Sequence, residues 1–259
     1  MSKQVALLFE QELTRRAVDF RRDAGSDRYV IHNRGLDLFV SLDNLGKDYA
    51  RDGDPSHIAH FVEAVLASNS EPRSWEAAQS SILFSLEPND YAEPPELRIP
   101  VSARVDRVPV HIHPVSGLIS FVTASMLRDW QVSGEVMERV AAQNLADALR
   151  RATLEVKPAG DVQVGFLQTA LPLKASMILA PNLRDIAAPV LGWPLHAVIP
   201  ARDFLYLWAA RHSDFIGRVG KVVVDEFTSS AYPITTEVFE ISDDGIAAIG
   251  AFPVEAAPD

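Results

Sequence analysis

PITTEVFEISDDGIAAIGAF, residues 233–252, carries the clearest fold signal in the chain. Two β-rich runs flank Asp243-Asp244-Gly245, and a tight Asp-Gly turn between such runs is a strong hairpin signal. A second hairpin is expected near the start, where residues 28–32 and 36–42 flank Asn33-Arg34-Gly35. Strands joined by short turns pair in the antiparallel sense, so we expect antiparallel sheets.

Helical periodicity separates these hairpins. Apolar residues recur at helical spacing in three long segments, which are 3–23, Asp54-Pro55 to about Asn69, and about Ser133 to Arg151. Shorter helices are predicted around 182–191 and from Ser213-Asp214 onward, and strand-like runs in 80–123, 161–172 and 196–200. Residues 204–208 fit either a strand or a helix. Helices interspersed with adjacent hairpins indicate an α+β fold with mixed, largely antiparallel sheets and packed helices.

The chain of 259 residues is long enough for one large domain or two modest ones. We divide it into a helix–hairpin–helix portion at 1–70 and a main α+β domain at 71–255. One continuous domain is the alternative. The last four residues, 256–259, are expected to form a disordered tail.

The composition narrows the chemistry and the compartment. The chain has no cysteine, which excludes thiol nucleophiles, disulfides, Fe–S clusters and cysteine-based zinc sites and fits a reducing cytoplasm. Its first residues contain no signal-peptide pattern, and no apolar run approaches the roughly 18–20 residues of a membrane span. We therefore expect a soluble cytoplasmic protein without a membrane partner.

The charge balance indicates which partners are suitable. With 35 acidic and 24 basic residues, the formal net charge is −11. Nucleic-acid affinity depends on lysine and arginine at phosphates, so we expect no nucleic-acid partner. An acidic surface is better suited to a basic protein.

Motifs that would identify an enzyme or a cofactor are missing from the sequence. No G-x-G-x-x-G follows a predicted strand, and there is no G-x-S-x-G or H-E-x-x-H. The run from Gly217 to Lys221 lacks the spacing and the hydroxyl of a phosphate loop. We therefore assign no catalytic residue and expect no cofactor.

Two histidine pairs are candidate metal ligands. His111 and His113 are two residues apart in the strand-like VHIHP, and His57 and His60 are three apart on a predicted helix. Either spacing places two imidazoles where they can share a metal, but the sequence identifies no third ligand. Because Val110 and Ile112 alternate with His111 and His113, we predict that this pair faces solvent.

Polar residues at two further places are candidate ligand-binding groups. Arg202 and Asp203 follow the strand-like HAVIP, and loops placed by a rigid sheet often carry function. The competing interpretation, which we favour, is that Asp203 caps the next element and Arg202 is solvated. Asn144 lies on the apolar face of its helix, where we expect its amide to bridge to neighbouring backbone.

Three stretches together resemble a known family. They are SMLRDWQVSGEVMERVAAQNLADAL, HAVIPARDFLYLW and SDFIGRVGKVVVDEFTSSAYPITTEVFEISDDG. In order and spacing they are similar to an uncharacterised bacterial family, the YtpQ-like proteins, whose domain has no known function. The resemblance covers roughly residues 80 to 250.

The resemblance implies a cytosolic α+β protein with no established activity, so no catalytic residue is carried over. The family-like positions are Asn144, Leu145, Pro200, Asp203, Pro233, Ile234 and Thr235. Thr235 thereby joins Arg202, Asp203 and Asn144 as a candidate ligand-binding residue. The pair His111 and His113 is not part of the family pattern, which weakens a metal role.

Three functions remain open. The first is a non-enzymatic binding or protein-interaction protein, such as an adaptor or an immunity-type protein that masks a basic partner. The second is a metal-dependent hydrolase that uses His111 and His113 with an unidentified carboxylate. The third is a small-molecule binder at the strand exit of Arg202 and Asp203.

Overall fold

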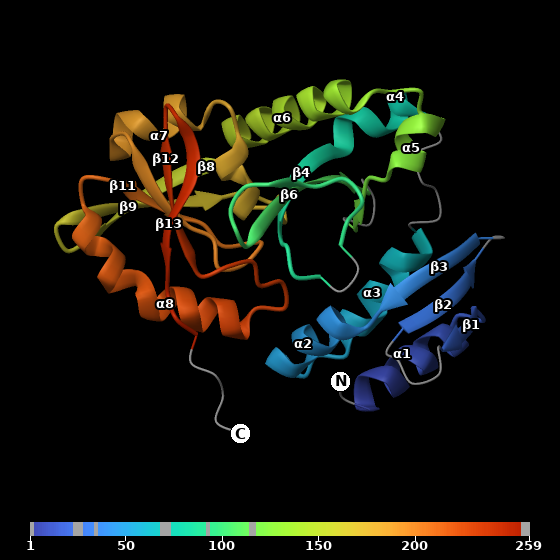
Figure 1. Ribbon diagram of the computed structural model, residues 1–259. Coiled ribbons are helices and arrows are strands. Elements are labelled where there is room, and N and C mark those ends of the chain that lie inside the picture. The colour runs from blue at the N-terminus through green and yellow to red at the C-terminus, as the bar shows by residue number, and fades with distance from the viewer. Residues whose placement is uncertain are drawn as a thin grey trace. The chain divides into compact units, whose positions relative to one another are not determined.

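The computed structural model describes residues 3–22, 28–33, 36–67, 74–91, 94–113 and 118–254 (Figure 1). The chain divides into two compact units, Met1–Arg73 with Ile112–Ser120, and Ser74–His111 with Phe121–Asp259. The sequence-based division assigns segment 112–120 to the main domain, but it belongs to the smaller unit, where Leu118 packs against the core. The predicted tail at 256–259 lies outside the described residues.

The smaller unit contains three helices and a three-stranded sheet within the described ranges. Its elements are α1 (Lys3–Arg15), β1 (Asp19–Arg22), β2 (Arg28–Asn33), β3 (Leu36–Ser41), α2 (Asp43–Asp52) and α3 (Ser56–Ala67). The sheet has the order β1-β2-β3 with antiparallel pairing, and Asn33 opposite Leu36 confirms the predicted hairpin. The turn residues Arg34 and Gly35 lie outside the described residues. Helix α3 is confirmed, whereas α2 was not predicted.

Helix α1 ends eight residues earlier than predicted, because the backbone turns at Ala17. Ala17 has a left-handed backbone with φ of 54°. The amides of Ala17 and Val18 donate to the carbonyls of Thr14 and Leu13, at 3.0 Å each. These two bonds form the Schellman motif that ends many helices. The motif usually contains glycine, so an alanine left no sign of it in the sequence.

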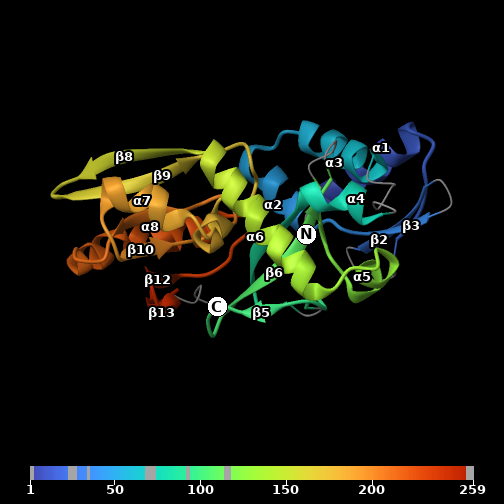
Figure 2. The ribbon, with the colours of Figure 1, turned by 90° about the horizontal axis from the view of Figure 1, so that it is seen from above.

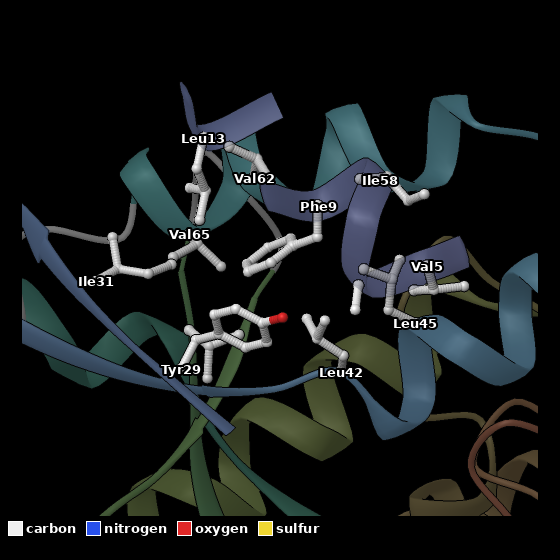
Figure 3. Close-up of a cluster of buried hydrophobic side chains, with 12 residues drawn as sticks. Val5, Phe9, Leu13, Tyr29, Ile31, Leu42, Leu45, Ile58, Val62 and Val65 are labelled. Carbon is white, nitrogen blue, oxygen red and sulfur yellow. The ribbon is translucent and has the colours of Figure 1, made fainter. Parts of the chain in front are cut away.

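Side chains from α1, α3 and β2 form the core of the smaller unit (Figure 3). Phe9 packs edge-on against Tyr29, with ring centroids 5.1 Å apart. The Tyr29 hydroxyl donates to Glu10 Oε1 at 2.7 Å. Val62 and Val65 approach the same cluster from α3, so the two helices cover one face of the sheet.

The larger unit is built around a six-stranded sheet. Its first part contains α4 (Trp75–Ala78), η1 (Gln79–Ser81), β4 (Ile82–Pro88), β5 (Ile99–Pro100), β6 (Val105–Ile112), β7 (Ile119–Phe121), α5 (Ala124–Asp129) and α6 (Gly134–Arg151). Strands β6 and β7 each have residues in both units. The rest contains β8 (Thr153–Ala159), β9 (Val162–Gln168), η2 (Ala175–Leu179), α7 (Leu183–Leu191), β10 (Leu195–Val198), β11 (Tyr206–Ala209), η3 (Ser213–Phe215), α8 (Ile216–Ser229), β12 (Glu237–Ser242) and β13 (Gly245–Ala251).

The order of the six strands is β13-β12-β10-β11-β9-β8, and each pair is antiparallel. Helices α7 and α8 cover opposite faces of this sheet (Figure 1). A second sheet places β6 between β4 and β5, again antiparallel, and α6 packs on β4. The predicted α+β class and the β12–β13 hairpin are therefore confirmed.

Local sequence explains the best-predicted helix. Ser133 caps α6 by accepting a hydrogen bond from the Val136 amide, and the helix then runs to Arg151 as predicted. Met137, Ala141 and Leu145 recur at helical spacing on its buried face. Every helix in the described part of the chain is too short or too polar to cross a membrane.

Candidate functional site

Arg202 forms a buried ion pair with Glu87. Its Nη2 donates to both carboxylate oxygens of Glu87, at 2.9 Å each. The two side chains are only 14% and 2% exposed. The favoured interpretation of Arg202 as a solvated residue is therefore wrong. Its partner lies 115 positions away in the chain, so the sequence contained no sign of the pair.

Three further side chains surround this pair. The Tyr91 hydroxyl donates to Glu87 Oε2 at 2.6 Å, and Ser85 Oγ bonds the other oxygen. The Tyr232 ring lies 4.5 Å from the Arg202 guanidinium carbon, within cation–π range. Burial, reinforced by the negative Glu87, raises the pKa of the Tyr91 phenol well above its ordinary value, so the hydroxyl remains a donor.

Asp203 does not cap a helix. It is exposed in the turn that leads to strand β11, and the Phe204 amide closes this turn on the Ala201 carbonyl at 3.1 Å. Within the described ranges the Asp203 side chain forms no hydrogen bond and no ion pair. The capping interpretation is wrong because a strand, not a helix, follows.

Asn144 has the structural role that we expected. Its Nδ2 donates to the carbonyls of Gln79 and Ile82, at 2.7 Å each. These bonds fasten the start of β4 to α6. Because its amide nitrogen is occupied in this way, Asn144 acts by holding β4 in place.

Thr235 belongs to a second buried carboxylate network. Its Oγ1 donates to Glu237 Oε2 at 3.1 Å, and Ser102 Oγ donates to the same oxygen at 2.7 Å. The Glu237 amide donates back to Thr235 Oγ1 at 3.1 Å. Both Thr235 and Glu237 are buried, so this network holds the start of β12 in one conformation.

Backbone bonds connect the two networks. The Arg202 amide donates to the Tyr232 carbonyl at 3.1 Å, and the Ile234 amide to the Pro200 carbonyl at 2.8 Å. The strand exit after β10 therefore runs beside the segment that leads into β12. Arg202 and Thr235 lie at this junction, while Asn144 acts at the far end of β4.

A cavity of about 350 Å³ lies beside this junction. It is lined by residues from five segments of the larger unit, which include Asn89, Asp90, Arg104, Phe227, Thr235 and Val254. Its volume is within the range of small-molecule sites, roughly 300–1,000 Å³. Of the sequence-based candidates, only Thr235 lines it. Asn89, Asp90 and Arg104 were missed, because they lie in loops without a recognisable motif.

The cavity has opposite charges on its wall. Arg104 and Asp90 are both exposed, and neither forms an ion pair within the described part of the chain. Phe227, Ile234 and Val254 add apolar surface. The Asn89 amide nitrogen donates to the Ala103 carbonyl at 2.8 Å, which leaves its oxygen as an acceptor. The cavity can therefore contact a cation, an anion and an apolar group at once.

The prediction that His111 faces solvent is wrong. His111 is only 4% exposed, opposite Ile82 of β4. Burial runs through consecutive positions 108–111 of β6, so both faces of the strand are covered there. His113 is half-buried in the smaller unit. No group of three or more potential ligands that could hold a metal occurs among the described residues, either here or at His57 and His60.

No family model, no curated protein and no solved structure matches this chain. The resemblance to the YtpQ-like family therefore stays a prediction.

Proposed function

We propose that the protein binds a small zwitterionic molecule in the cavity beside β12. One observation carries this proposal. Arg104 and Asp90 line the same cavity, and neither forms an ion pair with the other or with another described residue. A ligand that has a carboxylate and an ammonium group can pair with both. Such charge-assisted hydrogen bonds are stronger and shorter than neutral ones.

A site whose walls are already held in place loses little free energy on ordering when a ligand binds. Pro88, which lines the cavity, directly follows Glu87 and is held by the Arg202 pair. Thr235 is held by Glu237. The proposed binding site is therefore the neighbouring cavity and not Arg202 and Asp203 themselves. Arg202 would act as a positioning residue that holds Glu87 and the adjacent Pro88.

Phe227, Ile234 and Val254 favour an apolar group attached beside the two charged groups of the ligand. A free α-amino acid with an aliphatic side chain has this distribution of groups. The protein would accordingly act as a binding protein for amino acids or similar small zwitterions.

Three probes test the proposal by isothermal titration calorimetry. They are L-leucine, N-acetyl-L-leucine, which lacks the ammonium group, and L-leucinamide, which lacks the carboxylate. We expect leucine to bind at least about 10-fold more tightly than either analogue, the usual effect of one charged hydrogen bond. Equal affinities, or no heat up to about 10 mM leucine, would rule the proposal out.

Two variants test which residue binds the carboxylate of leucine and which binds its ammonium group. Arg104→Gln should lower leucine affinity to that of leucinamide, and Asp90→Asn should lower it to that of N-acetyl-leucine. Arg128 and Asp129 are exposed, adjacent residues of α5 that do not line the cavity. The matched control variants Arg128→Gln and Asp129→Asn should therefore bind leucine like the wild type. Loss of binding in the control variants would indicate a general charge effect instead of a site.

A further inference from the structure

The six-stranded sheet has two edges that differ in chemistry. Strands β8 and β13 lie at its opposite sides (Figure 2). The outermost strand of any sheet presents unpaired N–H and C=O groups that can pair with another chain. Natural proteins therefore protect such edges with charged residues, proline or bulges.

Strand β8 is protected in this way and β13 is not. β8 contains Glu155, Lys157 and Pro158. β13 has the sequence GIAAIGA, without a charge or a proline, and all of its residues except Ile246 are exposed. Within the described residues β12 is its only hydrogen-bonded neighbour. The one protective feature is a register shift, which leaves Ile249 without an opposite residue on β12.

The register between β12 and β13 shows which side chains lie on each face of the regular part of this edge, Gly245–Ala248. On one face Ile246 lies opposite Ile241 and Ala248 opposite Phe239, and both β12 residues are buried. On the other face Ala247 lies opposite Glu240, whose side chain is 42% exposed and whose Oε2 lies 3.4 Å from His196 Nε2. One face of this edge is therefore apolar, and the other is acidic.

We propose that the edge Gly245–Ala248 accepts an extended segment of a partner protein as a seventh strand, with the pattern apolar–basic–apolar. Apolar residues would continue the rows of Ile246 and Ala248, while a lysine or arginine would lie opposite Ala247. Adjacent strands are about 4.8 Å apart, so this residue stands about 10 Å from Glu240 in backbone position. The methyl group of Ala247 leaves room for the long basic side chain to reach the carboxylate.

Charge favours a basic partner over a second copy of this chain. Each copy has a net charge of −11, and β13 itself has no basic residue to meet Glu240. The acidic turn residues Asp243 and Asp244 directly precede the strand. A partner with basic residues next to its extended segment complements all of these charges.

The test uses a synthetic five-residue peptide, acetylated and amidated, with a central lysine between two valines and threonine at both ends. Isothermal titration calorimetry should detect binding, and deuterium exchange of the protein's amides should slow at Gly245–Ala251. A peptide with central glutamate should bind about 2- to 5-fold more weakly, the range of a single surface ion pair. A peptide with N-methylated valines should not bind, because it cannot complete the strand ladder.

Variants separate the edge from other surfaces. Ala247→Lys should abolish binding by placing a charge on the edge, whereas Val190→Lys, at an exposed apolar position on α7, should leave it unchanged. Glu240→Gln should abolish the preference for lysine over glutamate and retain the rest of the affinity. Far-ultraviolet circular dichroism verifies that each variant is folded.

Several outcomes would overturn the proposal. Binding of the N-methylated peptide, or equal loss in Val190→Lys and Ala247→Lys, would exclude strand addition at this edge. A dimer in sedimentation velocity that Ala247→Lys dissociates, together with absence of peptide binding, would show that a second copy occupies the edge instead. Leucine titrations do not involve β13, so this result and that for the cavity are independent.

Discussion

Arg202 Nη2 lies 2.9 Å from both carboxylate oxygens of Glu87, and this contact joins the turn after β10 to the end of β4. The pair is buried, with hydroxyls of Ser85 and Tyr91 on the carboxylate. A buried charge that loses its partner is much more costly than a buried pair that is removed as a whole. The interaction therefore couples the turn after β10 to the end of β4 near the cavity, and the position of each depends on the other.

Replacing only one member of this pair should be strongly destabilising. We expect Arg202→Met to lower the free energy of unfolding by about 3–5 kcal/mol, because it leaves the Glu87 carboxylate buried without a cation. Urea unfolding followed by circular dichroism measures the change. The double variant Glu87→Gln/Arg202→Met should regain part of the loss. If Arg202→Met were as stable as the wild type, the pair would have no role in holding β4.

The amide of Asn144 should contribute to stability at the start of β4. Asn144→Ala removes the donors to the carbonyls of Gln79 and Ile82 and should cost about 1–3 kcal/mol. The neighbouring Gln143 is exposed and its amide nitrogen donates to Asp147 at the surface, so Gln143→Ala should change stability by less than about 0.5 kcal/mol. Thermal or urea unfolding compares the two variants. Equal effects would indicate loss of general helix packing rather than of these two bonds.

His57 should make the smaller unit more stable in mild acid. Its Nε2 lies 2.9 Å from Asp52 Oδ2, and this carboxylate raises the pKa of the imidazole above its ordinary value. A raised folded-state pKa contributes stability that is fully present below about pH 6.5 and is lost as pH rises through the folded pKa. We expect His57→Gln to reduce the loss of stability between about pH 6 and 8. NMR titration of His57 tests the direction independently, and a pKa below the ordinary value would contradict it.

The helix end at Ala17 offers a stabilising substitution. Non-glycine residues in the left-handed region cost roughly 1–2 kcal/mol, and Ala17 has φ of 54°. Ala17→Gly should therefore raise stability by up to about 1 kcal/mol, since glycine also loses more entropy on folding. Gln11→Gly, at an exposed position inside α1, should instead lower it by about 1 kcal/mol. Destabilisation by both substitutions would show that the strain at Ala17 is negligible.

The elements that were predicted well are those whose signals are local. Helix α6 has a serine cap and a long apolar stripe, and the β12–β13 hairpin has an Asp-Gly turn. Elements with weak local signals were missed. Helix α2 is strongly polar, and β8 contains a lysine and a proline. The early end of α1 was missed because Ala17 adopts a conformation for which alanine is not a marker.

The candidate site was predicted only in fragments, because its parts meet through tertiary contacts. Thr235 was identified from the resemblance and does line the cavity, but Arg104, Asp90 and Asn89 have no motif. His111 alternates with apolar residues as a solvent-facing residue would, yet its side chain is buried. Periodicity reports which residues share a face of a strand, but not whether that face is covered.

The sequence by itself determined the α+β class, most helices and hairpins, and the chemistry that a chain without cysteine cannot perform. These properties follow from local periodicity, turn residues and composition. Only the tertiary structure decided that Arg202 is paired with Glu87, that His111 is buried, and that five separate segments line one cavity with Arg104 and Asp90 on its wall. Each of these depends on residues far apart in the chain, and burial is a property of what packs on a residue, not of the residue itself.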